Sequence, residues 1–137
     1  MNLPRQLLIR IEAWNMRRLY LRDLRKLSLS SADKLQYMTN HLADFWGRFR
    51  SFTTSRPPDI RSSLTGNFFG SIEMVSRVLA DEMTTQSERL KPSVTSSWTT
   101  YLKRFRALKK GKEWSWNSVD ECYLAFEEFR RALTSEA

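Results

Sequence analysis

Apolar residues recur at intervals of three and four positions in five separate segments of the chain, which is the spacing of one face of an α-helix. The clearest example consists of Leu35, Met38, Leu42, Phe45, Phe49 and Phe52. No segment keeps the alternating pattern of a strand, and the 137 residues include only four glycines and four prolines. The pattern predicts an all-α fold, a single-domain bundle of about five helices over residues 1–137.

Boundary signals divide the chain further. We expect helices over residues 5–28, 30–52, 67–90, 93–110 and from 118 onward. Ser30 with Asp33, and Ser118 with Glu121, have the spacing of a capping box, in which side chains bond the unpaired backbone N–H groups of a helix start. Residues 53–66 include two consecutive prolines, which break helices, so this segment is predicted to be a loop or hinge.

The same spacing predicts the core. The expected buried side chains of the first and third helices are Ile9, Ala13, Met16, Tyr20, Leu24, Leu27, Phe68, Ile72, Val75, Leu79, Met83 and Leu90. Those of the last two helices are Val94, Trp98, Tyr101, Phe105, Leu108, Val119, Cys122, Phe126, Phe129 and Leu133. Cys122 is therefore expected to act as a small buried apolar residue.

Positive charge is concentrated in residues 93–112, which contain six basic residues and no acidic one. They are Lys103, Arg104, Arg106, Lys109, Lys110 and Lys112. Lys103, Arg106 and Lys110 fall on one helical face, where like charges repel by a few tenths of a kcal/mol per pair. The chain as a whole carries a net charge of +8. Such a stripe is most easily understood if it binds a polyanion.

Nucleic acid is the polyanion that we favour, because clustered Lys and Arg release condensed counterions when they meet phosphates. A second contact row is expected on the first helix, and hydroxyls of the fourth helix can add bonds to phosphate oxygens. The predicted nucleic-acid-binding residues are Arg18, Arg22, Arg25, Thr99, Lys103, Arg106, Lys110 and Lys112. The prediction is sequence-independent contact with the backbone of RNA or single-stranded DNA, since no base-reading motif occurs.

Other interpretations of the same residues stay open. The acidic fifth helix can neutralise the basic stripe within one molecule or between copies, and a charged face can simply be solvated. Leu7, Ile11 and Trp14 form an apolar patch on the first helix, which predicts a contact with other protein subunits or self-association. A third alternative is a matrix-like protein that rests on an anionic membrane surface through its basic side chains.

The sequence offers little evidence for a catalytic site. His41 is the only histidine and has no second ligand near it, and a single cysteine excludes an internal disulfide. Trp114 and Trp116 can stack on bases or anchor the turn before the fifth helix. We expect no catalytic residue, no metal site and no cofactor. No segment is long and apolar enough to span a membrane, so we expect a cytoplasmic protein, or a nuclear one in a eukaryote.

By size and charge alone, the chain resembles the helical small subunits of CRISPR effector complexes, which lie along guide or target strands. The resemblance implies a non-catalytic subunit of a nucleoprotein complex and assigns no role to any single residue. The sequence therefore predicts an RNA- or DNA-binding helical subunit, with a protein-interaction module as the alternative.

Overall fold

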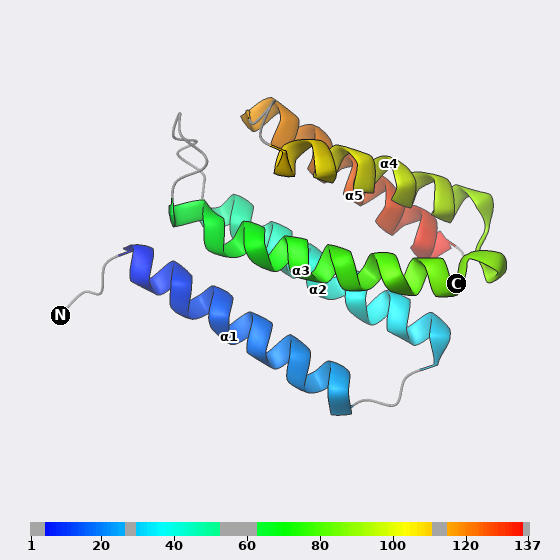
Figure 1. Cartoon of the computed structure of the whole chain (residues 1–137), viewed down its shortest axis with the longest axis horizontal. Coiled ribbons are helices and arrows are strands. Elements are labelled where there is room, and N and C mark those ends of the chain that lie inside the picture. The colour runs from blue at the N-terminus through cyan, green and yellow to red at the C-terminus, as the bar shows by residue number, and fades with distance from the viewer. Residues whose placement is uncertain (1–4, 27–29, 53–62, 111–114, 136–137) are drawn as a thin grey trace. The chain divides into compact units, whose positions relative to one another are not determined.

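The structure is a computed structural model that describes residues 5–26, 30–52, 63–110 and 115–135 (Figure 1). Its helices are α1 (Arg5–Lys26), α2 (Ser31–Phe52), α3 (Ser63–Thr85), the short 3₁₀ helix η1 (Ser87–Arg89), α4 (Pro92–Lys109) and α5 (Trp116–Ser135). No strand occurs in the described ranges. The prediction of an all-α fold with five main helices is confirmed.

Contacts between residues divide the chain into two compact units, Met1–Leu79 and Ala80–Ala137. The division falls inside α3, which contributes to both units. The first unit contains α1, α2 and most of α3, and the second contains the end of α3, η1, α4 and α5. The prediction of one domain over residues 1–137 stays a prediction.

The first unit packs successive helices in opposite directions (Figure 1). A Glu12–Arg48 ion pair of 2.8 Å links α1 to α2, and the rings of Phe49 and Phe69 link α2 to α3 at 6.4 Å between centroids. The predicted core residues that are buried here are Ile9, Ala13, Tyr20, Leu35, Met38, Leu42, Phe45, Phe49, Phe68, Ile72, Val75 and Leu79. Trp46 is fully buried as well, although the predicted stripe of α2 did not include it.

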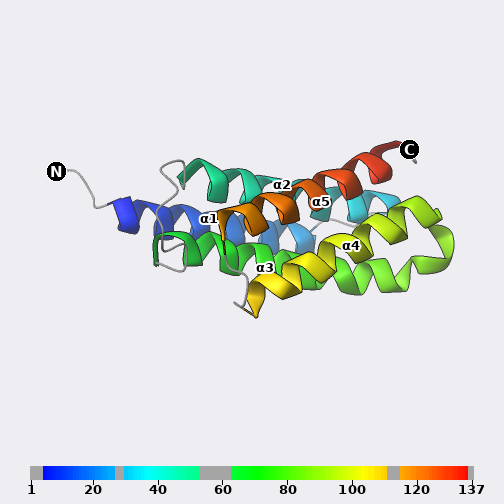
Figure 2. The same ribbon diagram turned by 90° about the horizontal axis from the view of Figure 1, so that it is seen from above.

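The second unit is dominated by the antiparallel pair of α4 and α5, which lie side by side in both views (Figures 1 and 2). All ten core residues predicted for these two helices are buried. Their aromatic rings interlock, with Trp98 and Phe129 5.0 Å apart and Tyr101 and Phe126 5.6 Å apart between centroids. This packing fixes which side of α4 faces outward.

Two boundaries of α3 differ from the predicted ones. The helix begins at Ser63, so residues 63–66 are helical, while the rest of the predicted loop lies outside the described residues. It ends at Thr85, and η1 follows, whereas the sequence predicted helix to residue 90. Thr84 and Thr85 have β-branched side chains, which disfavour helix, and their hydroxyls donate to backbone carbonyls one turn back, a bond that weakens the helix locally.

One of the two predicted caps is confirmed and the other is wrong. The backbone N–H of Asp33 donates to Ser30 Oγ at 3.3 Å, as expected for the start of α2. At the start of α5, the cap is Ser115, whose Oγ accepts a bond of 3.1 Å from the backbone N–H of Ser118. Ser118 therefore occupies the third position of the helix, three residues after the cap, and Glu121 is free for another contact.

Candidate nucleic-acid interface

Lys103, Arg106 and Lys110 form what we call the α4 row, an exposed stripe on the side of α4 away from α5. The buried face of the helix, from Val94 to Leu108, fixes this orientation because it packs in the core. None of the three side chains has a carboxylate partner among the described residues. Within the described ranges, the row is therefore a set of cations without a competing carboxylate, which suits it to meet an external anion.

The end of α4 explains part of this charge. Arg106 and Lys109 lie in the last turn, where cations interact favourably with the partial negative charge of the helix C-terminus, by about 0.3–1 kcal/mol each. Lys103 lies nearly two turns before the end at Lys109, so this effect does not reach it. Helix stability accounts for the basic last turn but not for the whole row.

The hydroxyl groups beside the α4 row donate hydrogen bonds to backbone carbonyls of α4 itself. Thr99 Oγ1 donates to the Thr95 carbonyl at 2.9 Å, and Thr95 Oγ1 donates to the Pro92 carbonyl at 3.1 Å. The prediction that Thr99 adds a bond to phosphate requires this hydroxyl to leave its helix bond first. Lys112, the last residue of the predicted set on this side, lies outside the described residues, as does Trp114.

The three arginines predicted on α1 differ in their surroundings. The Arg18 guanidinium lies over the Trp14 ring at 5.1 Å from its centroid, and Arg22 Nε is 3.4 Å from Asp23 Oδ1. Arg25 is exposed and has no partner among the described residues. Arg22 is therefore not an unpaired cation, although its exposed ion pair contributes little energy. That the rows of α1 and α4 form one surface stays a prediction.

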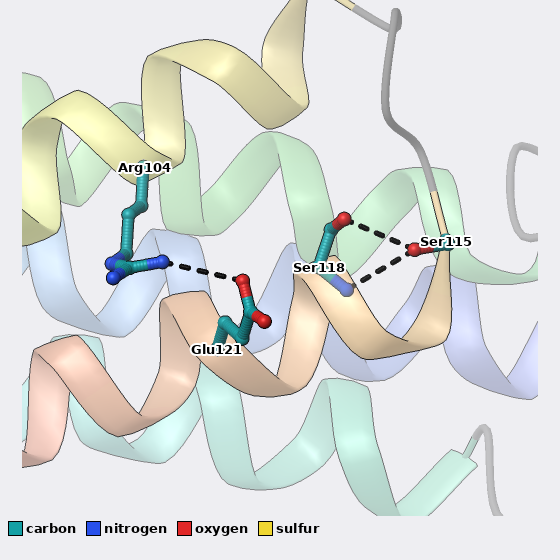
Figure 3. A network of polar contacts seen from close by, with 4 residues as sticks. All are labelled: Arg104, Ser115, Ser118 and Glu121. Carbon is teal, nitrogen blue, oxygen red and sulfur yellow. Dashed lines mark hydrogen bonds and ion pairs between the residues drawn. The ribbon is translucent and has the colours of Figure 1, made fainter.

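Sequence reasoning missed an ion pair between α4 and α5. Arg104 Nη1 is 3.2 Å from Glu121 Oε2, with 48% of the arginine and 65% of the glutamate side chain exposed (Figure 3). The two residues are 17 positions apart, so only the packing of α4 against α5 brings them together. A carboxylate of α5 thus pairs with Arg104, but among the described residues none pairs with the α4 row.

The apolar patch predicted on α1 is exposed. Leu7, Ile11 and Trp14, which we call the α1 face, have exposed fractions of 40%, 42% and 55%. Leu8 and Leu19 on the same helix are exposed to a similar degree, which the spacing analysis did not predict. Isolated exposed apolar residues are common in proteins, but three on one side of one helix point to a contact surface.

The two candidate reactive side chains lie in apolar surroundings. His41 packs against the rings of Tyr20 and Tyr37, at 4.7 and 4.6 Å between centroids. Burial lowers the pKa of His41 below 6.5, opposed by the nearby Asp44 and Asp23 carboxylates. Within the described part of the chain, no three His, Cys, Asp or Glu side chains gather as metal ligands.

Cys122 is fully buried in the core of the second unit. Burial raises the pKa of its thiol to about 12, and the positive charge of Arg104 opposes this shift. The thiolate is the reactive form of cysteine, so a thiol with this pKa is a poor nucleophile at neutral pH. The position of Cys122 supports the structural role predicted for it.

Comparison with known proteins finds no family model, no curated protein and no solved structure that matches the chain. Among the helices that the structure describes, none combines the length and apolar character that crossing a membrane requires. The functional argument therefore depends on the charges, contacts and exposure of individual residues.

Proposed function

We propose that the protein is a non-catalytic helical subunit of a nucleoprotein assembly, which binds the phosphate backbone of RNA or single-stranded DNA through the α4 row. The observation that carries this proposal is the exposure of Lys103, Arg106 and Lys110 without carboxylate partners in the described structure. Three like charges on one face repel each other, and phosphates relieve this repulsion while releasing counterions.

The row is long enough to reach more than one phosphate. Lys103 and Lys110 are seven residues apart, which places them about 10 Å apart along the helix axis. A stacked strand with the duplex rise of roughly 3.4 Å per nucleotide places about three phosphates along this length. No contact with bases is needed for this binding, which agrees with the lack of a base-reading motif in the sequence.

The test is a triple charge reversal of the α4 row, Lys103→Glu with Arg106→Glu and Lys110→Glu. We expect affinity for single-stranded RNA and single-stranded DNA to fall by at least tenfold, equally for all base sequences, because only backbone contacts are lost. Fluorescence anisotropy with labelled oligonucleotides of several sequences, and with a duplex in parallel, measures this.

A matched control variant distinguishes the effect of losing the α4 row from the effect of lowering the net charge. Arg10, Arg89 and Arg131 are exposed, and none has a partner among the described residues. Reversing these three lowers the net charge from +8 to +2, as the row variant does. The proposal predicts a much smaller loss for the control, and equal losses would reject it. Flotation of both variants with anionic vesicles tests the alternative of a membrane surface.

The exposed α1 face favours a second candidate function, self-association. Its apolar side chains are next to Arg18, and a complementary surface occurs on α5, where Leu124 is 59% exposed and the carboxylate of Glu128 has no partner among the described residues. Contact between α1 of one copy and α5 of another would bury apolar area and pair opposite charges.

Light scattering tests this second function. Trp14→Ala is expected to convert an oligomer to a monomer, whereas Leu19→Ala is a control, because Leu19 is exposed on a different side of α1. A wild-type protein that is monomeric at high concentration would exclude self-association through this face.

A further inference from the structure

The Arg104–Glu121 ion pair lies at the edge of the α4 row that faces α5. Arg104 follows Lys103 directly, so its side chain projects about 100° further around the helix axis. Ala107, one turn later, is exposed and has only a methyl side chain. No large side chain of α4 therefore separates Arg104 from the row.

A shallow hollow of about 60 Å³ lies at this edge. Its lining consists of Arg104, Ala107, Leu108, Ser118 and Glu121. The Arg104 guanidinium reaches across towards α5 and meets the Glu121 carboxylate, while the Ser118 hydroxyl is directed to Ser115 (Figure 3). The hollow has room for a small polar group such as phosphate oxygens.

We infer that Glu121 restrains nucleic-acid binding by holding Arg104, and that Arg104 becomes a fourth phosphate-binding cation of the row when Glu121 is neutralised or displaced. This inference rests on the proposed function of the α4 row. Both side chains of the pair are about half exposed or more, so solvent screens their attraction and a phosphate group can compete for the guanidinium. The free carboxylate of Glu121 would in turn repel a strand that approaches Arg104.

The position of Glu121 on α5 makes this restraint specific. The arginine has the geometry to bind a carboxylate or a phosphate, which are alternative partners of the same guanidinium. Glu128 is exposed two turns further along α5 and has no partner among the described residues. The two glutamates thus carry the same charge on the same helix, but only Glu121 contacts Arg104.

The test is a double-mutant cycle measured as affinity for single-stranded oligo(dT) and oligo(U) at one fixed salt concentration. Glu121→Gln is expected to bind about threefold more tightly than wild type, the size of effect that an exposed charge pair gives. Glu128→Gln is the matched control for net charge and is expected to show a clearly smaller gain. Arg104→Gln alone is expected to weaken binding slightly, because it leaves the carboxylate of Glu121 unpaired beside the row.

The decisive variant is the double mutant Arg104→Gln with Glu121→Gln, which should lose the gain of Glu121→Gln. Equal gains for Glu121→Gln and Glu128→Gln, or a gain that persists without Arg104, would overturn the inference while the function of the row stands. If wild type binds neither oligonucleotide, or if reversal of the row has no effect, the proposed function itself fails. Circular dichroism of each variant verifies that the helices are intact.

Discussion

Replacement of Phe129 with alanine is expected to remove much of the stability of the α4–α5 pair. Phe129 is fully buried, and its ring lies 5.0 Å from the Trp98 ring and 6.5 Å from the Phe126 ring between centroids. Truncation of a fully buried phenylalanine costs about 3–5 kcal/mol, from lost apolar burial and from the cavity that remains. A whole domain is stable by only about 5–15 kcal/mol, so the loss is large.

Urea unfolding followed by circular dichroism measures this loss as a change in the free energy of unfolding. Arg131→Ala is the matched control on the same helix, because Arg131 is exposed without a partner among the described residues and its truncation should change stability by no more than about 0.5 kcal/mol. Phe129→Leu keeps most of the volume and should cost less than the alanine variant. Similar small effects of Phe129→Ala and Arg131→Ala would refute the packing of α4 on α5.

Three further predictions concern other parts of the chain. A Cβ added at Gly47 or Gly70 meets no atom within 4 Å, so alanine at either exposed helical position should raise stability by about 0.5–1 kcal/mol in urea unfolding. The folded state lowers the pKa of His41 below 6.5, so the unfolded chain binds a proton more readily. The free energy of unfolding should therefore fall as the pH drops below about 6.5. His41→Gln should reduce this dependence of the unfolding free energy on pH, measured by urea unfolding at several pH values. The Cys122 thiol, with a pKa raised to about 12, should react slowly with a thiol reagent at pH 8 and rapidly in urea.

Spacing predicted the helices and their inward residues well because burial follows the 3.6-residue period along one helix. In α4 and α5, every expected core residue is buried. The burial of Trp46 was not predicted because Trp46 lies outside the stripe that contains Phe45 and Phe49. The buried side of α2 covers a wider arc than that stripe. The cap at Ser115 was missed because Ser118 has an equally suitable side chain, and only the backbone path distinguishes the two.

The candidate site was predictable in part, for the same physical reason. The α4 row follows from spacing within one helix, and its exposure in the structure agrees with the predicted face. The Arg104–Glu121 pair depends on how α4 and α5 align along their lengths, which no local pattern encodes. The contact of Arg18 with Trp14 was within reach of sequence reasoning, because residues four apart on a helix are neighbours.

The dependence of binding on salt tests the central claim most directly, because it counts the phosphates that the protein neutralises. The logarithm of the association constant for single-stranded oligo(dT) falls linearly with the logarithm of salt concentration, by about 0.7 for each contact. For the three cations of the α4 row, we predict that the charge-reversal variant has a slope shallower by about 2 than wild type. Equal slopes for wild type and variant would contradict the account, since the row would then not contact phosphate.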